Sequence, residues 1–549
     1  MHPLDWFVLV GTLALIVGYG VYKTRLRAAG ELLSGSKDVS LWTIGLGIMA
    51  TQASAITFLS TRGQAYAEDM GFIQFYFGLP LAVILVSAFF VPAYRKMSAI
   101  TAYQFLEQRF DRKTRLFTAA LFLMSRGLAA GITIFAPAIV LSAALGLSLN
   151  LMIIIIGLIV VFYTVSGGSA AVAVTQKWQM LTILGGMGIA AYLLVDKIPV
   201  SMPEAYDIAG KMGKLSIIDT SFDFENRYTL WSGLIGGLFL SLSYFGTDQS
   251  QVQRYLGAEN LSTSRLGLLF NGVFKVPMQF GILCIGVLLF VFYQFTQPPI
   301  FFNESEVNRA PVEVQAELVE LENFHANSFA AKREAILIGD WAAVDAHTET
   351  LAQIRKSYIT KLETHVPNFQ PKDTDYVFIT FVLNFLPKGL VGLLLAVIIS
   401  AAMSSTAGEV SALATTTYVD YYTVFKGASK RPKRTIRLLT FIWGLAAIGV
   451  ALAAPLYENL IQLVNVLGSL FYGTILGIFL IALFIKPVQG KSILMAGILG
   501  QFVVFVCHYL NVTEVISIAY LWYNVIGSVT VVVTAITLHY WFKREAIYS

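Results

Sequence analysis

Ser404 and Ser405 stand side by side in the middle of a long apolar run, residues 389–422. Two hydroxyls are tolerated in such a helix because each can bond to a carbonyl one turn earlier. In helical geometry the carbonyl of Ala401 points toward them, so three hard oxygen atoms could face one point in space. Oxygen atoms with little formal charge suit an alkali cation better than a transition metal. The alternative is that these small residues only let helices pack closely.

Two charged residues also lie inside apolar runs. Glu409 follows one turn after the two serines, and Arg126 lies deep in another run, where its guanidinium cannot easily reach the membrane interface. A buried guanidinium can bind a carboxylate with two hydrogen bonds. Arg126 therefore either binds a carboxylate of a substrate or forms a structural ion pair with Glu409 or with backbone carbonyls. Glu409 could pair with Arg126 or Lys275, or form a proton-linked or cation site.

The composition predicts a membrane protein. The 549 residues are 56% hydrophobic and 13% charged, with a mean hydropathy of +0.69, and apolar runs of bilayer-spanning length recur along the chain. We expect an all-α polytopic membrane protein. The net charge of +5 lies mostly in loops and reports topology rather than a nucleic-acid partner. Cys284 and Cys507 both lie in apolar runs, which argues against a disulfide scaffold or a cysteine metal site.

Thirteen transmembrane helices account for the apolar runs. Basic residues follow the odd-numbered spans, among them Lys23, Arg95, Arg254, Lys430 and Lys543. The positive-inside rule then places the N-terminus outside and the C-terminus inside. The first run lacks a preceding basic region, so we interpret it as a retained helix rather than a signal peptide. We expect a multi-pass protein of the cell inner (plasma) membrane with spans at residues 5–22, 40–61, 72–97, 114–146, 149–166, 172–195, 229–246, 266–296, 388–422, 434–455, 458–484, 490–510 and 518–543.

Small and polar residues interrupt two of these spans at matching places. The second span has Thr51, Gln52, Ser54 and Thr57 in its middle, and the seventh is rich in glycine and serine. Broken helices at corresponding positions of two halves indicate an inverted-repeat transporter with its site at the breaks. The predicted units are an extra helix and loop at 1–39, a first five-helix repeat at 40–195, a second at 229–484, and two extra helices at 485–549.

Residues 300–375 differ from the rest because they are acidic and have an amphipathic helical rhythm. The predicted topology places this insertion outside the cell, and we expect a helical hairpin over the outer mouth. A variable insertion without direct chemistry is the favoured interpretation. The chain stops soon after the last span, so we expect no signalling domain of the kind that a membrane solute sensor would carry.

Four motifs resemble the solute:sodium symporter family. They are GITIFAPAIVLSAALGL at 131–147, YTVSGGSAAVAVTQKWQ at 163–179, DQSQVQRYLGAENLSTSR at 248–265 and AAMSST at 401–406. The form of the third motif and the APA in the first are most similar to the branch that carries iodide, monocarboxylates and vitamins, and bacterial sialic-acid carriers are also relatives. The resemblance implies a LeuT-type 5+5 inverted repeat with extra helices, and no enzyme activity.

The resemblance also implies a sodium site. The family binds sodium with two backbone carbonyls at the break of the second span, which match Ala50 and Ala53. On the ninth span it uses a carbonyl and two hydroxyls, which match Ala401, Ser404 and Ser405. Two family features are missing: Gln176 stands where many members have aspartate, and Ala407 and Gly408 stand where a second sodium site would have hydroxyls. We therefore expect one sodium ion per cycle.

By position, the resemblance implies a substrate cavity between the second, third, fourth, seventh and eleventh spans. Its candidate residues are Thr57, Gln74, Tyr76, Arg126, Ser241, Tyr244, Phe245, Lys275, Gln462 and Asn465. Tyr244 and Phe245 match aromatic residues that gate sugar-carrying relatives. The expected function is sodium-coupled import of a small organic solute by a monomer in the lipid bilayer, with a carboxylate such as a monocarboxylate, vitamin or sugar acid as the favoured solute. A sodium-coupled carrier of a neutral sugar and a non-transporting solute sensor are the alternatives.

Overall fold

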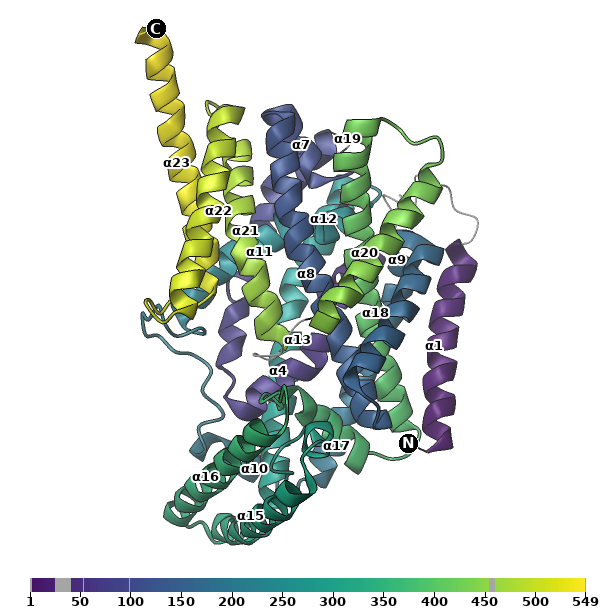
Figure 1. Ribbon diagram of the computed structural model, residues 1–549, viewed down its shortest axis with the longest axis vertical. Coiled ribbons are helices and arrows are strands. Elements are labelled where there is room, and N and C mark those ends of the chain that lie inside the picture. Colours follow the sequence, from purple (N-terminus) through teal and green to yellow (C-terminus); the bar gives the residue numbers. More distant parts are fainter. Residues whose placement is uncertain (1, 25–40, 53, 98, 454–459, 549) are drawn as a thin grey trace.

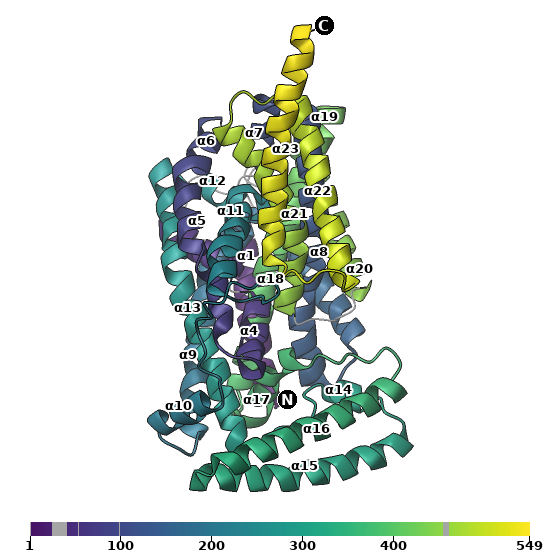
Figure 2. The same cartoon turned by 90° about the vertical axis from the view of Figure 1, so that its left-hand side faces the viewer.

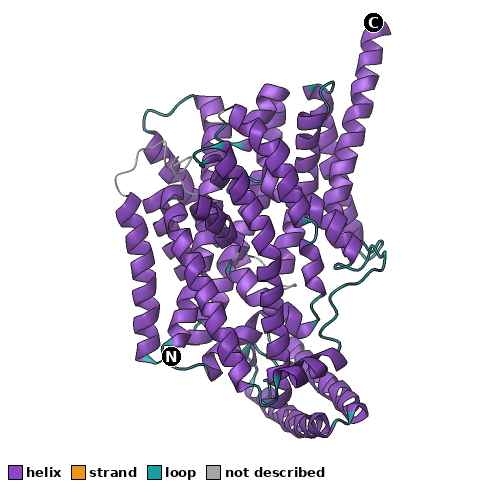
Figure 3. Ribbon diagram, turned by 180° about the vertical axis from the view of Figure 1, so that it is seen from behind, coloured by secondary structure: helices purple, strands orange, loops and turns teal. Residues whose placement is uncertain are grey.

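The computed structural model describes residues 2–24, 41–52, 54–97, 99–453 and 460–548, and within these ranges it is a bundle of helices without a strand (Figures 1 and 3). Ten helical segments are long and apolar enough to cross a membrane: Gly71–Lys96, Arg112–Leu145, Leu149–Ser166, Trp178–Lys197, Leu261–Phe295, Leu390–Lys426, Pro432–Ala453, Leu460–Phe484, Gly490–Val512 and Leu521–Arg544. They bear out an all-α polytopic membrane protein.

The first half of the bundle contains the helices that correspond to spans one to six. Spans five and six both lie in the long helix α9. The elements are α1 (Pro3–Thr24), α3 (Leu41–Gln52), α4 (Ala55–Ala67), η1 (Gly71–Tyr76), α5 (Leu79–Leu85), η2 (Val86–Phe90), α6 (Val91–Lys96), α7 (Ala102–Arg109), α8 (Arg112–Leu145), α9 (Leu149–Lys197) and α10 (Met202–Lys211).

The second half contains the seventh to thirteenth spans and one apolar helix that the sequence did not predict, α17. Its elements are η3 (Ser232–Gly236), α11 (Gly237–Thr247), α12 (Gln249–Leu256), α13 (Leu261–Phe295), α14 (Glu304–Val307), α15 (Val312–Ile338), α16 (Trp341–His365), η4 (Thr374–Tyr376), α17 (Val377–Phe385), α18 (Leu390–Thr416), η5 (Thr417–Tyr422), α19 (Thr423–Lys426), α20 (Pro432–Ala453), α21 (Leu460–Phe484), α22 (Gly490–Val512) and α23 (Leu521–Tyr548).

The second span is broken, as its polar residues predict. α3 ends at Gln52 and α4 begins at Ala55, with Ser54 accepting a hydrogen bond from the backbone nitrogen of Thr57 at the start of α4. A helix that ends here leaves its last carbonyls without helical partners. Those carbonyls are therefore available to a ligand in the middle of the bundle.

The seventh span breaks later than its glycines and serines predict. The chain stays helical from Ser232 to Thr247, first as a π-helix and then as α11. The π-helix takes up an extra residue without unwinding. The chain leaves the helix at Asp248, whose carboxylate caps α12 by accepting from the Ser250 nitrogen. The break therefore contains an aspartate rather than a glycine.

α18 is the most buried of the long apolar helices, because 89% of its most apolar 18-residue stretch lies inside the protein. It packs against α8, α9, α1 and α20. The Asp5 carboxylate accepts hydrogen bonds from the nitrogens of Gly389 (2.5 Å) and Gly392 (3.3 Å) at the start of α18. A Cβ atom at Gly392 would lie 2.0 Å from the Asp5 carbonyl oxygen, so glycine lets α1 approach this closely.

The insertion forms the expected helical hairpin. α15 and α16 pack along each other around a small apolar cluster that includes Leu318, Tyr358 and Leu362. The hairpin lies at the end of the bundle where the N-terminus is found, and the C-terminus lies at the opposite end (Figures 1 and 2).

Candidate substrate and cation site

A cavity of about 140 Å³ lies where the break between α3 and α4 meets α5, α8, α11, α13, α18 and α21. Two oppositely charged residues line it, Arg126 and Glu409, together with a third charge, Lys275. Most of the substrate-binding residues that the sequence predicts also line it: Thr57, Tyr76, Arg126, Ser241, Tyr244, Phe245, Lys275 and Asn465. The structure therefore brings these scattered residues to one place.

Gln74 and Gln462 do not line this cavity. Gln74 is buried in η1, where its amide donates to the Tyr228 carbonyl (2.7 Å) and accepts from the Asp219 nitrogen (3.0 Å). It therefore anchors the loop before η3. Gln462 donates to the side chain of Gln64 (3.3 Å) and so links α21 to α4.

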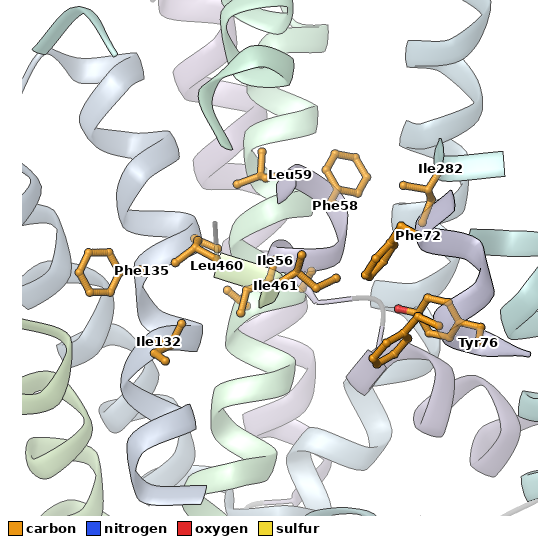
Figure 4. Close-up of a cluster of buried hydrophobic side chains, with 14 of the residues drawn as sticks. Ile56, Phe58, Leu59, Phe72, Tyr76, Ile132, Phe135, Ile282, Leu460 and Ile461 are labelled. Carbon is orange, nitrogen blue, oxygen red and sulfur yellow. The ribbon is translucent and has the colours of Figure 1, made fainter. Parts of the chain in front are cut away.

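Apolar and aromatic side chains make up much of the cavity wall, next to its charged and polar residues. Tyr244 and Phe245, the predicted gate, pack edge to face with ring centroids 5.1 Å apart. Tyr76 and Ile56 belong to the buried cluster of hydrophobic side chains in Figure 4, which draws on helices far apart in the sequence. Ile56 and Ile461 of that cluster both line the cavity.

The charged cluster at the cavity has one guanidinium and two carboxylates. Arg126 pairs with Glu409 through Nη1 (2.9 Å) and with Asp248 through Nη2. Its Nη2 also reaches the hydroxyl of Tyr472, which in turn donates to Asp248 (2.9 Å). The side chains of all three charged residues are at most 7% exposed. Of the two interpretations of Arg126, the ion pair with Glu409 is therefore present in this state.

Sequence reasoning missed Asp248, Tyr472 and Thr133, which lie close to Arg126 and Glu409. Asp248 is the first residue of the DQSQVQRY motif and follows directly on an apolar run, a position at which a carboxylate is unusual. That signal could have identified it. Thr133 and Tyr472 line the cavity, but nothing in their sequence surroundings distinguishes them from packing residues.

The structure describes four of the five predicted sodium ligands, Ala50, Ala401, Ser404 and Ser405. Ser404 Oγ is buried and has no hydrogen-bond partner among the described residues, while Ser405 lines the cavity. α18, which carries both serines and Ala401, packs against α3 and α4 on either side of the break. Ala50 is buried in the last turn of α3, where its carbonyl has lost its helical partner. Ala53 lies outside the described residues.

The side chain of Arg254 lies against Gly408, one of the residues that depart from the family pattern. A Cβ atom at Gly408 would lie 2.3 Å from Nη2 of Arg254, so glycine leaves room for this guanidinium. Arg254 Nη1 also bonds to the side-chain oxygen of Gln176, the residue that replaces the family's aspartate. The guanidinium of Arg254 therefore lies beside both Gly408 and Gln176, which depart from the family pattern and which led to the prediction of one sodium ion per cycle.

A helical membrane bundle with a cavity that contains charged residues at a helix break is typical of secondary transporters. The model of the sodium:solute symporter family matches residues 33–311 and 359–500. The chain belongs to this family, and the relatives described in the next paragraph are transporters and not enzymes. The resemblance that the motifs indicate is thereby confirmed, as is sodium as the coupling ion that the family implies.

Three relatives illustrate the similarity. The sodium/sialic acid symporter of Proteus mirabilis is 23% identical, over 96% of this chain and 93% of that protein. The sodium/iodide cotransporter of Homo sapiens is 29% identical, over 54% of this chain and 46%, or less than half, of that protein. The sodium-coupled monocarboxylate transporter 2 of Bos taurus is 23% identical, over 90% of this chain and 70% of that protein.

The fold also matches a solved structure, that of a substrate-bound, outward-open sodium-coupled sialic acid symporter. The TM-score is 0.75 at 22% identity, and the match covers 98% of each chain. This similarity bears on the fold of the chain and not on its substrate.

Proposed function

We propose that the protein imports a small organic solute with a carboxylate group, driven by one sodium ion per cycle. The solute occupies the cavity at Arg126, and the sodium ion lies between the break after α3 and the serines of α18. The proposal includes thirteen transmembrane helices in two inverted repeats of five with extra helices, an N-terminus outside, a C-terminus inside, and a monomer in the inner (plasma) membrane.

The observation that carries the proposal is the buried hydroxyl of Ser404, which has no hydrogen-bond partner in the described part of the chain and lies on a helix that packs against α3 and α4. A buried hydroxyl without a partner is costly. A sodium ion bound by Ser404, Ser405 and the carbonyls of Ala50, Ala53 and Ala401 would satisfy it. The same ion would hold the broken helix against α18 and so order the cavity beside it.

The charges at the cavity support an acidic solute. Two cationic side chains, Arg126 and Lys275, line a cavity of about 140 Å³, well below the roughly 300–1,000 Å³ of pockets for drug-sized ligands. Arg126 Nε is buried and has no partner among the described residues, so a movement of the side chain toward the cavity would let it donate to a carboxylate oxygen. Hydroxyls from Thr57 and Ser241 and the amide of Asn465 could bond the rest of a small, polar solute.

The proposed transport cycle depends on the contacts that the α11–α12 turn and α12 make with α8 and α18. Asp248 links the α11–α12 turn to Arg126 of α8, and Gln253 donates to the Gly408 carbonyl of α18 (3.3 Å). These contacts must break for the bundle to open toward the basic, cytoplasmic side. Tyr244 and Phe245 line the cavity, and we propose that they close over the solute before these contacts break. A membrane potential of 100 mV adds about 2.3 kcal/mol per charge moved. If the solute is a monoanion that moves with one sodium ion, no net charge crosses the membrane and transport is electroneutral.

A neutral sugar is the second candidate, because Glu409 and Asp248 already occupy both terminal nitrogens of Arg126. Uptake by proteoliposomes distinguishes the two candidates. If Arg126→Lys weakens uptake of a carboxylate such as lactate, pyruvate, pantothenate or sialic acid, the proposal holds. If the sodium-driven solute is glucose or galactose, Arg126 has a structural role.

A further inference from the structure

We infer that Tyr94, Tyr103 and Tyr255 are positioning residues that fix the turn between α11 and α12. By fixing this turn, their hydroxyls hold the Asp248 carboxylate on Arg126 at the cavity. The part of the inference that concerns the turn depends on the hydrogen bonds of the structure alone. The part that concerns solute binding rests on the proposed function.

The last carbonyls of α11 cannot make ordinary helical bonds, because the chain turns at Asp248. In an α-helix each carbonyl accepts from the nitrogen four residues later. The nitrogen of Ser250, which would serve the Gly246 carbonyl, bonds instead to Asp248 Oδ1 (2.8 Å). The nitrogen of Gln251, which would serve the Thr247 carbonyl, bonds instead to the Asp248 carbonyl (3.0 Å). A buried carbonyl without a donor is costly, so both carbonyls need another partner.

Tyrosine hydroxyls supply the missing donors, and they serve the last three carbonyls of α11 one by one. The hydrogen bonds run from Tyr255 to Phe245 (3.0 Å), from Tyr94 to Gly246 (2.6 Å) and from Tyr103 to Thr247 (3.0 Å). The tyrosines belong to α12, α6 and α7, and all three are fully buried. The turn is therefore held by three separate elements, at a place that bulk water does not reach.

The side-chain amide of Gln249 fastens the same turn to α7. Its oxygen accepts from the Ala102 nitrogen (3.0 Å), and its nitrogen donates to the Ile100 carbonyl (2.9 Å). Tyr103 follows Ala102 directly in the chain. The start of α7 and the turn after α11 therefore share three hydrogen bonds, so the position of the turn follows that of α7.

The turn and the end of α11 carry residues that act at the cavity. Tyr244 and Phe245, the proposed gate, lie in the last turn of α11 and line the cavity. Asp248 Oδ1 accepts from the nitrogen (2.8 Å) and the hydroxyl (2.6 Å) of Ser250, which leaves Oδ2 for Arg126. A shift of the turn would therefore move this carboxylate relative to the guanidinium, and the two aromatic rings with it.

Replacing a tyrosine by phenylalanine isolates the role of the hydroxyl, because the ring remains. The Tyr103 ring packs against Phe122, with ring centroids 5.5 Å apart, and the Tyr94 ring packs against Phe479 at 6.1 Å. These ring contacts survive the substitution, while one carbonyl of the turn loses its donor. We expect the turn to loosen and its carboxylate to orient Arg126 less well, so a carboxylate solute should bind more weakly.

The first test is hydrogen–deuterium exchange of the full-length protein in lipid, which needs no solute. We expect Tyr103→Phe to speed the exchange of the amides at residues 248–252 about fivefold, as the loss of one hydrogen bond implies. Tyr255→Phe is the second variant if Tyr103→Phe does not fold. Tyr421→Phe is the matched control, because it removes a tyrosine bond to the Leu116 carbonyl (2.6 Å) outside this turn, and it should leave this exchange unchanged.

The second test is sodium-driven uptake of lactate, pyruvate, pantothenate and sialic acid. Tyr103→Phe should raise KM about fivefold in the native protein and less than about twofold in Asp248→Asn, because the hydroxyl acts through Asp248. Unchanged exchange at residues 248–252, equally fast exchange in Tyr421→Phe, or the same change of KM in both backgrounds would overturn the inference. Faster exchange in a protein that takes up none of these carboxylates with sodium contradicts only the proposed function.

Discussion

Two ion pairs join α8 to α18 and its extension η5, and they differ in what surrounds them. Arg126 pairs with Glu409, and Arg115 pairs with Asp420 at 2.7 Å. Each member of the second pair is eleven residues from its counterpart in the first, which is the register of two antiparallel helices. The first pair lines the cavity, while the cavity does not reach the second.

The second pair is enclosed by protein. Arg115 donates to the Val419 carbonyl (2.7 Å) and reaches Glu107, while Thr101 donates to Asp420 (2.9 Å). The first pair instead shares its arginine with Asp248 from the α11–α12 turn, and Arg126 Nε has no partner among the described residues. The same two helices thus carry a structural ion pair at one level and a ligand-accessible one eleven residues away.

The largest difference between the two pairs should appear on removing the arginines. Arg126→Ala leaves two carboxylates at the cavity, and we expect uptake to fall at least about 100-fold, as loss of about 3–5 kcal/mol from a broken buried pair implies. Arg115→Ala should lower the amount of folded protein by a similar destabilisation while the remaining protein keeps its KM. The measurement is the uptake of each variant divided by its amount of folded protein. Equal loss of uptake in both variants would remove the distinction.

The hydroxyl pairs on α18 sharpen the comparison. Ser404 and Ser405 lie at the proposed cation site, and Thr415 and Thr416, eleven residues on, lie about one turn before Asp420 of the enclosed pair. We expect Ser404→Ala with Ser405→Ala to raise half-saturating sodium at least about tenfold, because about 1.4 kcal/mol or more of ligation is lost. Thr415→Ala with Thr416→Ala is the matched control and should leave half-saturating sodium unchanged. A similar shift in both would argue against a local cation site.

The side-chain amides of Asn465 and Gln74 provide a second comparison, for which we expect smaller effects. Asn465 lines the cavity, and its Nδ2 is buried with no partner among the described residues. Asn465→Ala should raise KM up to about tenfold through the loss of one hydrogen bond of about 1 kcal/mol. Gln74→Ala should lower thermal stability and leave KM unchanged, because Gln74 bonds to the Tyr228 and Asp219 backbone and does not line the cavity. Concentration dependence of uptake and melting curves separate the two effects.

Thr101→Val should have the smallest effect. It removes one of the hydrogen bonds to Asp420 and should cost about 1 kcal/mol of stability. Because the enclosed pair does not contact the cavity, uptake, sodium affinity and pH dependence should stay within twofold of the native protein, roughly the spread of small stability effects. A large change in sodium affinity would show that the two pairs are coupled along α18.

Hydropathy predicts the class of protein and the long apolar helices, and the polar residues that interrupt the second span predict its break. The expected break of the seventh span was misplaced, since glycines in η3 are accommodated by π-helical bonding while the exit at Asp248 depends on its capping of α12. Arg126 and Glu409 were identified as intramembrane charges. Their pairing was one of several alternatives, and the structure was needed to select it, as it was to find that Gln74 anchors the loop before η3, because both contacts join residues more than 100 positions apart in sequence.

The most direct test of the account is uptake of labelled lactate, pyruvate, pantothenate, sialic acid, glucose, galactose and proline by proteoliposomes, with and without an inward sodium gradient. The account predicts sodium-dependent uptake of a carboxylate that is lost with Ser404→Ala and Ser405→Ala and weakened by Arg126→Lys. Uptake of a solute from this panel that does not depend on sodium would contradict it.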